Sequence, residues 1–308
     1  MLRAFFVHLS ENRSLRNFAE KSAIGQKVSG RFVAGTEIAD AVRATQTVNR
    51  AGMSVSIDNL GENVTNPEEA RQSAQLYHEI LDAIAANQLN ANISLKLTHM
   101  GLDVDETLAR DQVRALVAKC ASMNPPGFVR VDMEGSPYTQ RTLDFVHELH
   151  RMPGNGNSVG TVIQSYMRRS EGDVEKLLAE RIRIRLCKGA YKEPASIAFQ
   201  NKSEVDANYI KLMKILLKSG VYHGLATHDE NIILEAKAFA TREKIAPDSF
   251  EFQMLYGIRR DLQQSLVREG WRMRVYIPFG TEWYPYFMRR LGERPANVFF
   301  IARHMLRS

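Results

Sequence analysis

The sequence predicts an α/β protein, a (β/α)8 TIM barrel with extra helices at its N-terminal end. Three observations lead to this fold class. Eight short runs of apolar, β-prone residues alternate with longer stretches of helical periodicity, which is the pattern of a parallel sheet. A chain of 308 residues with 44% hydrophobic residues suits one such barrel and its core. Each of the eight runs also ends on polar side chains, where barrels assemble their sites.

The expected elements follow one another in a regular order. The expected strands are residues 53–57, 92–97, 128–131, 159–163, 182–187, 221–226, 250–253 and 274–277. The expected helices between them are residues 67–86, 106–122, 139–150, 171–178, 204–219, 232–240 and 259–269. Gly or Pro marks many of the joints. No linker or change of composition interrupts the chain, so we expect a single domain over 1–308, with helices from about 1–45 packed outside the barrel.

The residues at the ends of the strands are the first candidates for a site. They are Asp58-Asn59, Lys96 with Thr98, Asp132 with Glu134, Gln164 with Tyr166, Lys188, Thr227-His228, Gln253 and Tyr276. Because the active sites of such barrels lie at the carboxyl ends of the strands, these side chains are expected to meet at one end.

Composition narrows the kind of partner. The net charge of +6 comes from 41 basic and 35 acidic residues that are interspersed, so it permits contact with an anionic membrane without requiring it. No cluster of aromatics interleaved with Lys and Arg occurs, and a nucleic-acid partner is not expected. Cys120 and Cys187 form neither a disulfide framework nor a zinc motif, which favours a reducing, cytoplasmic location. No apolar run approaches the length of a membrane span.

Two weaker motifs do not lead to a site. His147 and His150 are three positions apart and lack the spacing of a His-Glu-x-x-His zinc helix, so no metal is expected. The Gly-rich segment 154–160 precedes a strand, whereas a dinucleotide-binding fingerprint follows one, so we interpret it as a loop.

The helix expected near the C-terminus carries an unusual face. Tyr286, Arg289, Arg290 and Glu293 recur at i, i+3, i+4 and i+7, so they share one side of the helix. Paired guanidinium groups can grip a carboxylate, and a glutamate one turn further can face the cationic nitrogen of the same molecule. This combination suits a small amino acid. The alternative is an exposed helix face with an ordinary i,i+4 ion pair.

Two alternatives remain open on residue chemistry alone. Lys96 or Lys188 could form a Schiff base in a different barrel enzyme acting on a small amino acid, although each could equally hold an anion or a buried ion pair. The second alternative is a basic module that binds nucleic acid or a membrane surface without catalysis.

The face at 286–293 resembles the Tyr-x-x-Arg-Arg-x-x-Glu signature of the proline dehydrogenase family, and the resemblance extends along the chain from about residue 50. Further matching segments, in the family's order, are residues 93–98, 130–134, 164–166, 185–191, 226–229, 252–257 and 275–278. The chain is most similar to the short monofunctional bacterial members, and a second, aldehyde-oxidising domain is not expected. The resemblance implies a distorted eight-stranded barrel, noncovalent FAD and oxidation of L-proline to 1-pyrroline-5-carboxylate by hydride transfer to the flavin. It also implies that electrons pass to a membrane quinone, with possible contact at the inner face of the membrane.

The resemblance also assigns roles to residues. Lys96, Arg289 and Arg290 would hold the proline carboxylate, Tyr276, Tyr286 and Leu255 would pack its ring, and Asp132 and Glu293 would balance the positive cluster. The implied flavin contacts are Gln164, Arg185, Leu186, Lys188, Gly189, Ala190, Tyr191, Thr227, His228 and Gln253. Arg185 is placed like the family residue near the flavin N5. Glu62 would pair with Arg289 as a gate over bound substrate.

Two features depart from the family pattern. Cys187 stands where the family has Val, which is a small apolar exchange. Residues before about 45 match weakly, and the sequence indicates no particular oligomeric state.

Overall fold

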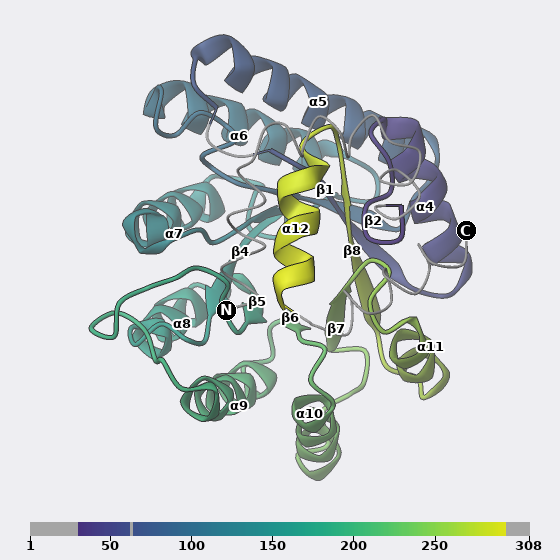
Figure 1. Cartoon of the computed structure of the whole chain (residues 1–308), viewed down its shortest axis with the longest axis vertical. Helices are drawn as coiled ribbons and strands as arrows, with labels where there is room; N and C mark the ends of the chain where they lie inside the picture. The colour runs from purple at the N-terminus through teal and green to yellow at the C-terminus, as the bar shows by residue number, and fades with distance from the viewer. Residues whose placement is uncertain (1–29, 62–63, 294–308) are drawn as a thin grey trace.

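The computed structural model describes residues 30–61 and 64–293, with side chains as far as Met288. In this part of the chain eight strands, all pairing in parallel, close into a barrel in chain order, as the sequence predicts (Figure 1). Strand β1 pairs with both β2 and β8, which completes the ring. The strands are β1 (Ser54–Asn59), β2 (Ala91–Leu95), β3 (Val129–Val131), β4 (Val159–Gln164), β5 (Arg183–Cys187), β6 (His223–Ala226), β7 (Phe250–Leu255) and β8 (Met273–Phe279).

Helices alternate with the strands as expected, and one helix precedes the first strand. They are α4 (Ile38–Arg50), α5 (Pro67–Ala86), α6 (Glu106–Ser122), α7 (Ser136–Arg151), α8 (Ser170–Ala179), α9 (Lys202–Lys218), α10 (Glu230–Arg242), α11 (Arg260–Arg268) and α12 (Trp283–Glu293). Local chemistry sets several starts. Asn66 accepts a hydrogen bond from the backbone N–H of Glu69, and Pro67 occupies the first turn of α5. Asp105 and Asp229 cap α6 and α10 in the same way.

The barrel is distorted in the position of its last helix. Helix α12 follows β8 but lies across the centre of the ring of strands instead of beside it (Figure 1). Helix α4, which precedes β1, packs against both β8 and β1 and so fills the outer position next to the closing strands. Helix α4 belongs to the N-terminal segment that was expected to pack outside the barrel. The structure describes this segment from residue 30 onward, and residues 1–29 lie outside the described part.

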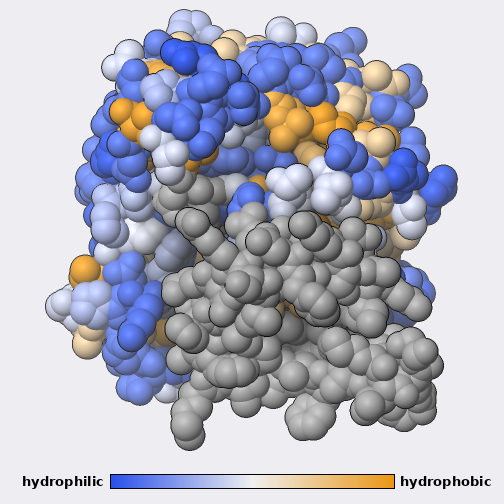
Figure 2. Space-filling model, turned by 45° about the horizontal axis from the view of Figure 1, so that its top comes forward, coloured by the Kyte–Doolittle hydropathy of each residue, from blue (hydrophilic) through white to orange (hydrophobic). Residues whose placement is uncertain are grey.

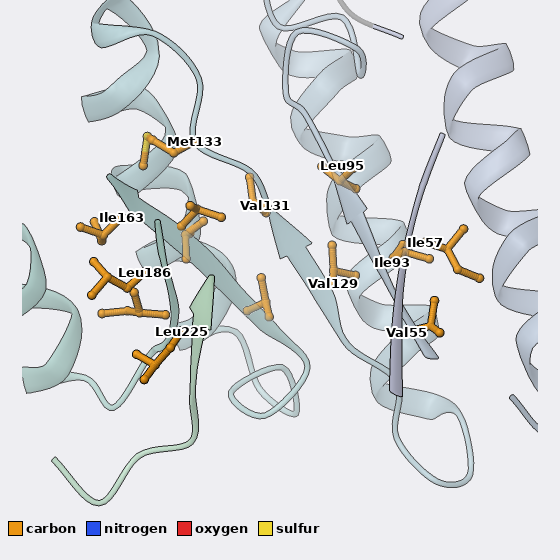
Figure 3. Close-up of a cluster of buried hydrophobic side chains, with 14 of the residues drawn as sticks. Val55, Ile57, Ile93, Leu95, Val129, Val131, Met133, Ile163, Leu186 and Leu225 are labelled. Atoms are coloured by element: carbon orange, nitrogen blue, oxygen red, sulfur yellow. The ribbon is translucent and has the colours of Figure 1, made fainter. Parts of the chain in front are cut away.

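The alternating side chains of each strand separate two environments. On β1, Val55 and Ile57 are almost fully buried and belong to the large apolar cluster that the strands share with the surrounding helices. Figure 3 shows this cluster continuing along the neighbouring strands, with Ile93 and Leu95 on β2. Burying branched side chains between sheet and helices supplies the main stabilising force of such a layer.

The barrel interior, by contrast, is lined by polar residues. Ser56 on β1, Ser94 on β2 and Arg185 on β5 alternate with the apolar residues, and Arg185 bonds both serines across the ring. Interior side chains of such barrels are more often aliphatic. A polar interior must be satisfied by its own hydrogen bonds, because unpaired polar groups are costly once buried.

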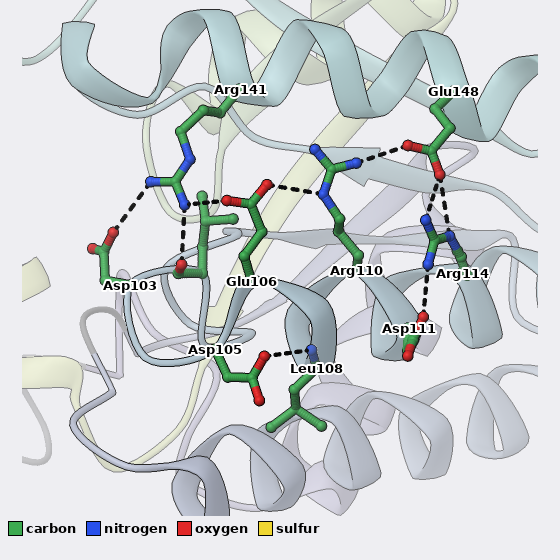
Figure 4. A network of polar contacts seen from close by, with 10 residues as sticks. Asp103, Asp105, Glu106, Leu108, Arg110, Asp111, Arg114, Arg141 and Glu148 are labelled. Carbon is green, nitrogen blue, oxygen red and sulfur yellow. Dashed lines mark hydrogen bonds and ion pairs between the residues drawn. The ribbon is translucent and has the colours of Figure 1, made fainter.

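The outer surface is held partly by ion pairs between helices. Glu148 on α7 accepts from Arg110 and Arg114 on α6, and Arg141 bonds Glu106 in the same network (Figure 4). On the face seen in Figure 2, hydrophilic side chains predominate over the coloured surface, with smaller hydrophobic patches. Across the described ranges, every helix is too short or too polar to cross a bilayer.

Candidate active site

Arg185 occupies the centre of the candidate site. Its Nη1 lies 2.7 Å from Asp132 Oδ1, its Nε donates to Gln253 Oε1 at 2.7 Å, and its Nη2 donates to Ser56 Oγ at 3.1 Å. Nη1 also lies 3.2 Å from Ser94 Oγ. Partners on four other parts of the barrel therefore fix one guanidinium in place, and a planar fork suits this arrangement better than an ammonium would.

Asp132 and Tyr276 lie above Arg185, toward the carboxyl ends of the strands. Asp132 Oδ1 accepts a hydrogen bond of 2.7 Å from Ser94, and its Oδ2 lies 3.4 Å from the Tyr276 hydroxyl. The Arg185 guanidinium carbon lies 5.3 Å from the centre of the Tyr276 ring. Burial, with the charges of Asp58 and Asp132, raises the pKa of Tyr276 well above its ordinary value. Tyr276 therefore stays protonated and can donate a hydrogen bond.

Asp58 is a member of this cluster that sequence reasoning noted at a strand end but did not assign to the site. Its side chain is 1% exposed and accepts a hydrogen bond of 3.2 Å from Tyr77 on α5. Burial raises the pKa of Asp58 to about 6, while the charge of Lys96 opposes the rise and Asp132 adds to it. Its position on β1, two residues beyond the interior Ser56, is the signal that could have identified it.

The interaction with Asp58 also places Lys96 among these residues. Lys96 follows β2 and is two residues beyond the interior Ser94, so it belongs to the same side of the strand. Glu134, likewise left unassigned, accepts from the Thr98 hydroxyl at 2.6 Å and from its backbone N–H at 3.1 Å. These bonds join the ends of β2 and β3 around the cluster.

An apolar group of side chains borders the polar residues around Arg185. Tyr286 on α12 is 7% exposed and packs with Leu60, Ile258 and neighbouring residues, and Leu255 at the end of β7 packs against the same group. The structure therefore brings the predicted ring-packing residues Tyr286 and Leu255 together beside the mouth of the barrel. An apolar wall next to a charged cluster can exclude water from a small ligand.

The loop after β5 presents the predicted cofactor residues from Lys188 to Tyr191. Ala190 and Tyr191 are exposed, and the Ala190 N–H lies 3.4 Å from Gln164 Oε1. Gly189 has φ +115°, and a Cβ there would lie 2.2 Å from the Tyr166 ring. Only glycine allows this backbone and this close approach.

Lys188 is tied to two carboxylates. Its Nζ lies 2.5 Å from Asp206 and 2.8 Å from Asp229, and Lys202 joins the same pair. Burial acts to raise the pKa of Asp229, but Lys188 and Lys202 hold that pKa below its ordinary value. An ammonium held between two ionised carboxylates is a poor Schiff-base nucleophile, because it must lose a proton first.

Most of the other predicted flavin contacts line the same end of the barrel. Gln164 donates to the Glu134 carbonyl at 3.0 Å, and the Thr227 hydroxyl accepts from the Asp229 N–H at 3.1 Å. His228 Nε2 accepts from the Leu255 N–H at 3.0 Å, which leaves the proton of the neutral ring on Nδ1.

Leu186 is placed differently. Its side chain is fully buried and lies in the apolar cluster between strands and helices (Figure 3). Along β5 it alternates with the interior Arg185 and so has the opposite orientation. The cofactor contact expected for Leu186 is therefore not provided by its side chain.

Several predicted residues lie outside the described part. Glu62 is not described, so the proposed gate stays a prediction. Arg289, Arg290 and Glu293 lie in α12, which confirms the predicted helix, but their side chains are outside the described residues. Their positions share a helix face with Tyr286, as the sequence pattern predicts.

The donor set of the described mouth fits a flavin dinucleotide. Arg185 places a fixed positive charge in the interior, where it would offset the extra electron density of a reduced ring. The loop from Gly189 to Tyr191 offers a close backbone approach and an exposed aromatic ring. In the part of the chain that is described, no grouping of three or more His, Cys, Asp or Glu side chains is suited to a metal ion.

Comparison with known proteins gives a consistent result. A family model described as proline dehydrogenase matches residues 41–303. Proline dehydrogenase 1 of Bacillus subtilis is 42% identical over 308 residues, which is 100% of both chains. Proline dehydrogenase 2 of the same organism is 38% identical over 98% of each chain. Proline dehydrogenase of Deinococcus radiodurans is 42% identical over 90% of this chain and 89% of its own.

A solved structure supports the same fold. Proline utilization A from Bdellovibrio bacteriovorus, inactivated by N-propargylglycine, superposes with a TM-score of 0.80 at 26% sequence identity. The match covers 87% of this chain and 32% of that one, so the present chain spans about a third of the longer protein.

Proposed function

The chain belongs to the proline dehydrogenase family, and from this premise we propose that it oxidises L-proline to 1-pyrroline-5-carboxylate with noncovalent FAD. Proline oxidation, the first step of proline catabolism, is the activity of the family. The observation that carries the finer proposal is the guanidinium of Arg185, fixed inside the barrel beside Asp132 and Tyr276, with Lys96 acting on the neighbouring Asp58. This arrangement combines a site for a small zwitterion with a positive charge suited to an electron-rich ring.

Binding of proline would use opposite charges at the two ends of the molecule. Lys96, with Arg289 and Arg290 from α12, would hold the carboxylate through charge-assisted hydrogen bonds of roughly 1.5–3 kcal/mol each. Tyr276, Tyr286 and Leu255 would pack the ring and exclude water. Positioning of this kind is the protein's main contribution to hydride transfer.

The reaction removes a hydride from the ring carbon next to nitrogen that does not carry the carboxylate, and a proton passes from the nitrogen to solvent, which leaves the C=N bond of the product. When bound, FAD would accept the hydride and pass the electrons on to a membrane quinone. Positive charge develops on the substrate nitrogen during this step. Asp132, Asp58 and Glu293 would lower the free energy of that charge. Arg185 would keep the flavin ring aligned with the substrate.

The visible spectrum of the purified protein, recorded without oxygen, tests the proposal. A flavin band that bleaches with L-proline and is unchanged by D-proline is the expected result. A flavin band that L-proline leaves unchanged would retain the cofactor and refute the substrate. Protein that is colourless and takes up no added FAD would refute the cofactor.

The acceptor and the location are tested separately. We expect a soluble quinone analogue to reoxidise the bleached protein, and we expect a fraction of the protein to sediment with anionic vesicles at low salt. Reoxidation by oxygen alone would argue against the quinone. Equal recovery with neutral vesicles would argue against an electrostatic membrane contact.

A further inference from the structure

A second hollow lies at the opposite end of the barrel from the candidate active site. It has a volume of about 740 Å³ and is formed by the segments that lead into β4, β5, β6 and β8. We call it the floor hollow, and its lining includes His150, Asn157, Arg183, Tyr222 and Arg272. The volume is sufficient for a small metabolite.

The floor hollow carries an excess of positive charge. Its lining contains Arg181, Arg183, Arg272 and Arg274, whereas Glu180 is its acidic residue. Glu180 is already bound by Arg151 and His147 on the helix side. Arg274 is paired with Glu251 at 2.6 Å inside the barrel. Within the described ranges, Arg181 and Arg183 therefore line the hollow without a direct ion pair of this kind.

Arg183 lacks a direct ion pair. Burial lowers its pKa, and the charge of Glu251 opposes this only from beyond ion-pair distance. Among residues 30–61 and 64–288, no carboxylate lies within ion-pair distance of its guanidinium, and its buried Nε has no hydrogen-bond partner. The group lies instead over two aromatic rings, 4.2 Å from the centre of Phe128 and 5.0 Å from that of Tyr222. The two rings hold the fork in place and leave its donors for another partner.

Arg130 increases the positive charge just behind Arg183. It is 4% exposed, its Nη1 donates to the carbonyls of Thr161 and Arg183, and its Nε has no partner in the described part of the chain. A narrow inner space lined by Arg130, Arg183 and Arg274 adjoins the hollow, with Glu251 as its carboxylate. Burial, together with Arg130 and Arg183, lowers the pKa of the nearby His223 to about 3, so this histidine is neutral and adds no charge.

Buried cations in proteins are normally paired, because an uncompensated charge away from water is costly. We propose that the floor hollow binds a small oxyanion, the phosphate or carboxylate group of a metabolite, with Arg183 as its main contact. Arg181 and Arg272 at the rim attract the anion, and the stacked fork of Arg183 receives two of its oxygens. This site is separate from the reaction at the other end of the barrel and does not depend on the proposed function.

Thermal unfolding of the purified protein tests the proposal, with inorganic phosphate and malonate as probes at constant ionic strength set with chloride. We expect a saturable rise in Tm with at least one of the two probes, and the probe with the lower apparent Kd identifies the preferred oxyanion. The variant Arg183→Gln is expected to weaken binding at least tenfold. Arg71→Gln, on the outer surface of α5, serves as the control and should leave it unchanged.

The rim variant Arg272→Gln provides a second test that remains available if Arg183→Gln does not fold. Its side chain is 54% exposed, so we expect a stable protein with several-fold weaker binding. An equal Tm rise in the wild type and both variants would place the anion elsewhere and overturn the proposal. So would the absence of any rise beyond that given by chloride.

Discussion

At the scale of single residues, the site depends on charges that are buried and yet partnered. Asp58 shows the cost of this arrangement. Its ionised form is disfavoured by burial more than it is favoured by Lys96, so the pKa of this carboxyl rises to about 6 and it is still mostly ionised at neutral pH. A buried carboxyl of this kind lowers the stability of the fold when it is ionised, so we expect its role to be the positioning of neighbouring side chains.

Replacing Asp58 by Asn should therefore stabilise the protein. The pKa of Asp58 is about 6 in the folded state and 3.8 in the unfolded state, so stability falls as the pH rises from about 4 to about 6, and the full cost is present above pH 6. The shift corresponds to roughly 3 kcal/mol, which is an upper limit for the gain. We expect the variant to be more stable at pH 7–8 and equal to the wild type below about pH 4, as measured by urea denaturation across pH.

The same variant should bind proline less well. The charge of Asp58 acts on Lys96. If its loss lets Lys96 move, the substrate carboxylate loses one charge-assisted hydrogen bond, which corresponds to about a tenfold rise in KM. Steady-state kinetics with L-proline measure this change. An Asp58→Asn protein with unchanged KM and unchanged stability at pH 8 would show that Asp58 is not coupled to the site.

At the scale of elements, the loop after β5 is shaped by Gly189. Alanine there would require an unfavourable φ and would meet the Tyr166 ring. We expect Gly189→Ala to cost at least about 2 kcal/mol and to reduce the FAD content of the purified protein. The absorbance ratio at the flavin and protein bands, with thermal unfolding, measures both effects.

Gly172 in α8 supplies the matched control for this substitution. A Cβ at Gly172 meets nothing within 4 Å, and the residue is helical. Gly172→Ala should therefore be neutral or stabilising by about 0.5 kcal/mol and should keep full FAD content. A similar loss of FAD in both variants would mean that the loop geometry at Gly189 is not responsible.

The packing of α6 against α7 is the second feature at this scale. Glu148 joins two arginines of α6 (Figure 4). Arg110 also lies 4.7 Å from the centre of the Phe145 ring. We expect Glu148→Gln to reduce stability by about 0.5–1 kcal/mol at low salt and by less at 1 M salt, because these groups are partly exposed. Glu171→Gln, which breaks a single exposed pair with Lys211, should cost less. Equal losses at both salt concentrations would contradict an electrostatic origin.

Sequence periodicity located the strands and helices well, because each short apolar run is a buried strand. It could not place α12, since the same amphipathic pattern suits a helix beside the barrel or across its mouth. It also missed the polar interior. The alternation of Ser54, Ser56 and Asp58 with Val55 and Ile57 was visible in the sequence, but Asp58 was considered only as a strand end.

The sequence predicted the residues of the candidate site about as well as it predicted the strands and helices. Asp132, Gln253 and Tyr276 were identified from strand ends and resemblance, and the structure places them around Arg185. Lys96, identified in the same way, acts on the neighbouring Asp58. Leu186 shows the limit of a contiguous motif, because residues adjacent on a strand face opposite sides. The floor hollow had no signal at all, since its arginines come from two segments far apart in the chain, Arg181 with Arg183 and Arg272 with Arg274.

At the scale of the whole molecule, polar bonds run through the length of the barrel. Glu251 joins Arg274 at 2.6 Å and Gln253 at 2.6 Å, and Gln253 in turn contacts Arg185. The candidate active site is thus connected to the opposite end through the interior. Burial acts to raise the pKa of Glu251, but Arg274 and the hydrogen bonds to its carboxylate hold the pKa below its ordinary value.

Replacing Glu251 by Gln should destabilise the whole barrel by roughly 3–5 kcal/mol, because Arg274 would be left buried without a counter-charge. The wild-type stabilisation is present above the unfolded value of 4.5 and is lost as the pH falls through the lower folded pKa. Thermal unfolding at pH 7 and pH 4 should therefore show a difference between variant and wild type that narrows in acid. Glu269→Gln, at an exposed pair with Lys237, should change stability by less than about 1 kcal/mol.

Closure of the ring by β1 and β8 also has a consequence for synthesis. Ser54 pairs with Arg274, 220 residues later, and α4 packs on both strands. At roughly 5–20 residues per second, a ribosome needs on the order of 10 to 45 s to make the intervening chain. During that time the nascent chain carries an unpaired strand edge and an uncovered apolar helix face, both of which favour aggregation until the last strand emerges.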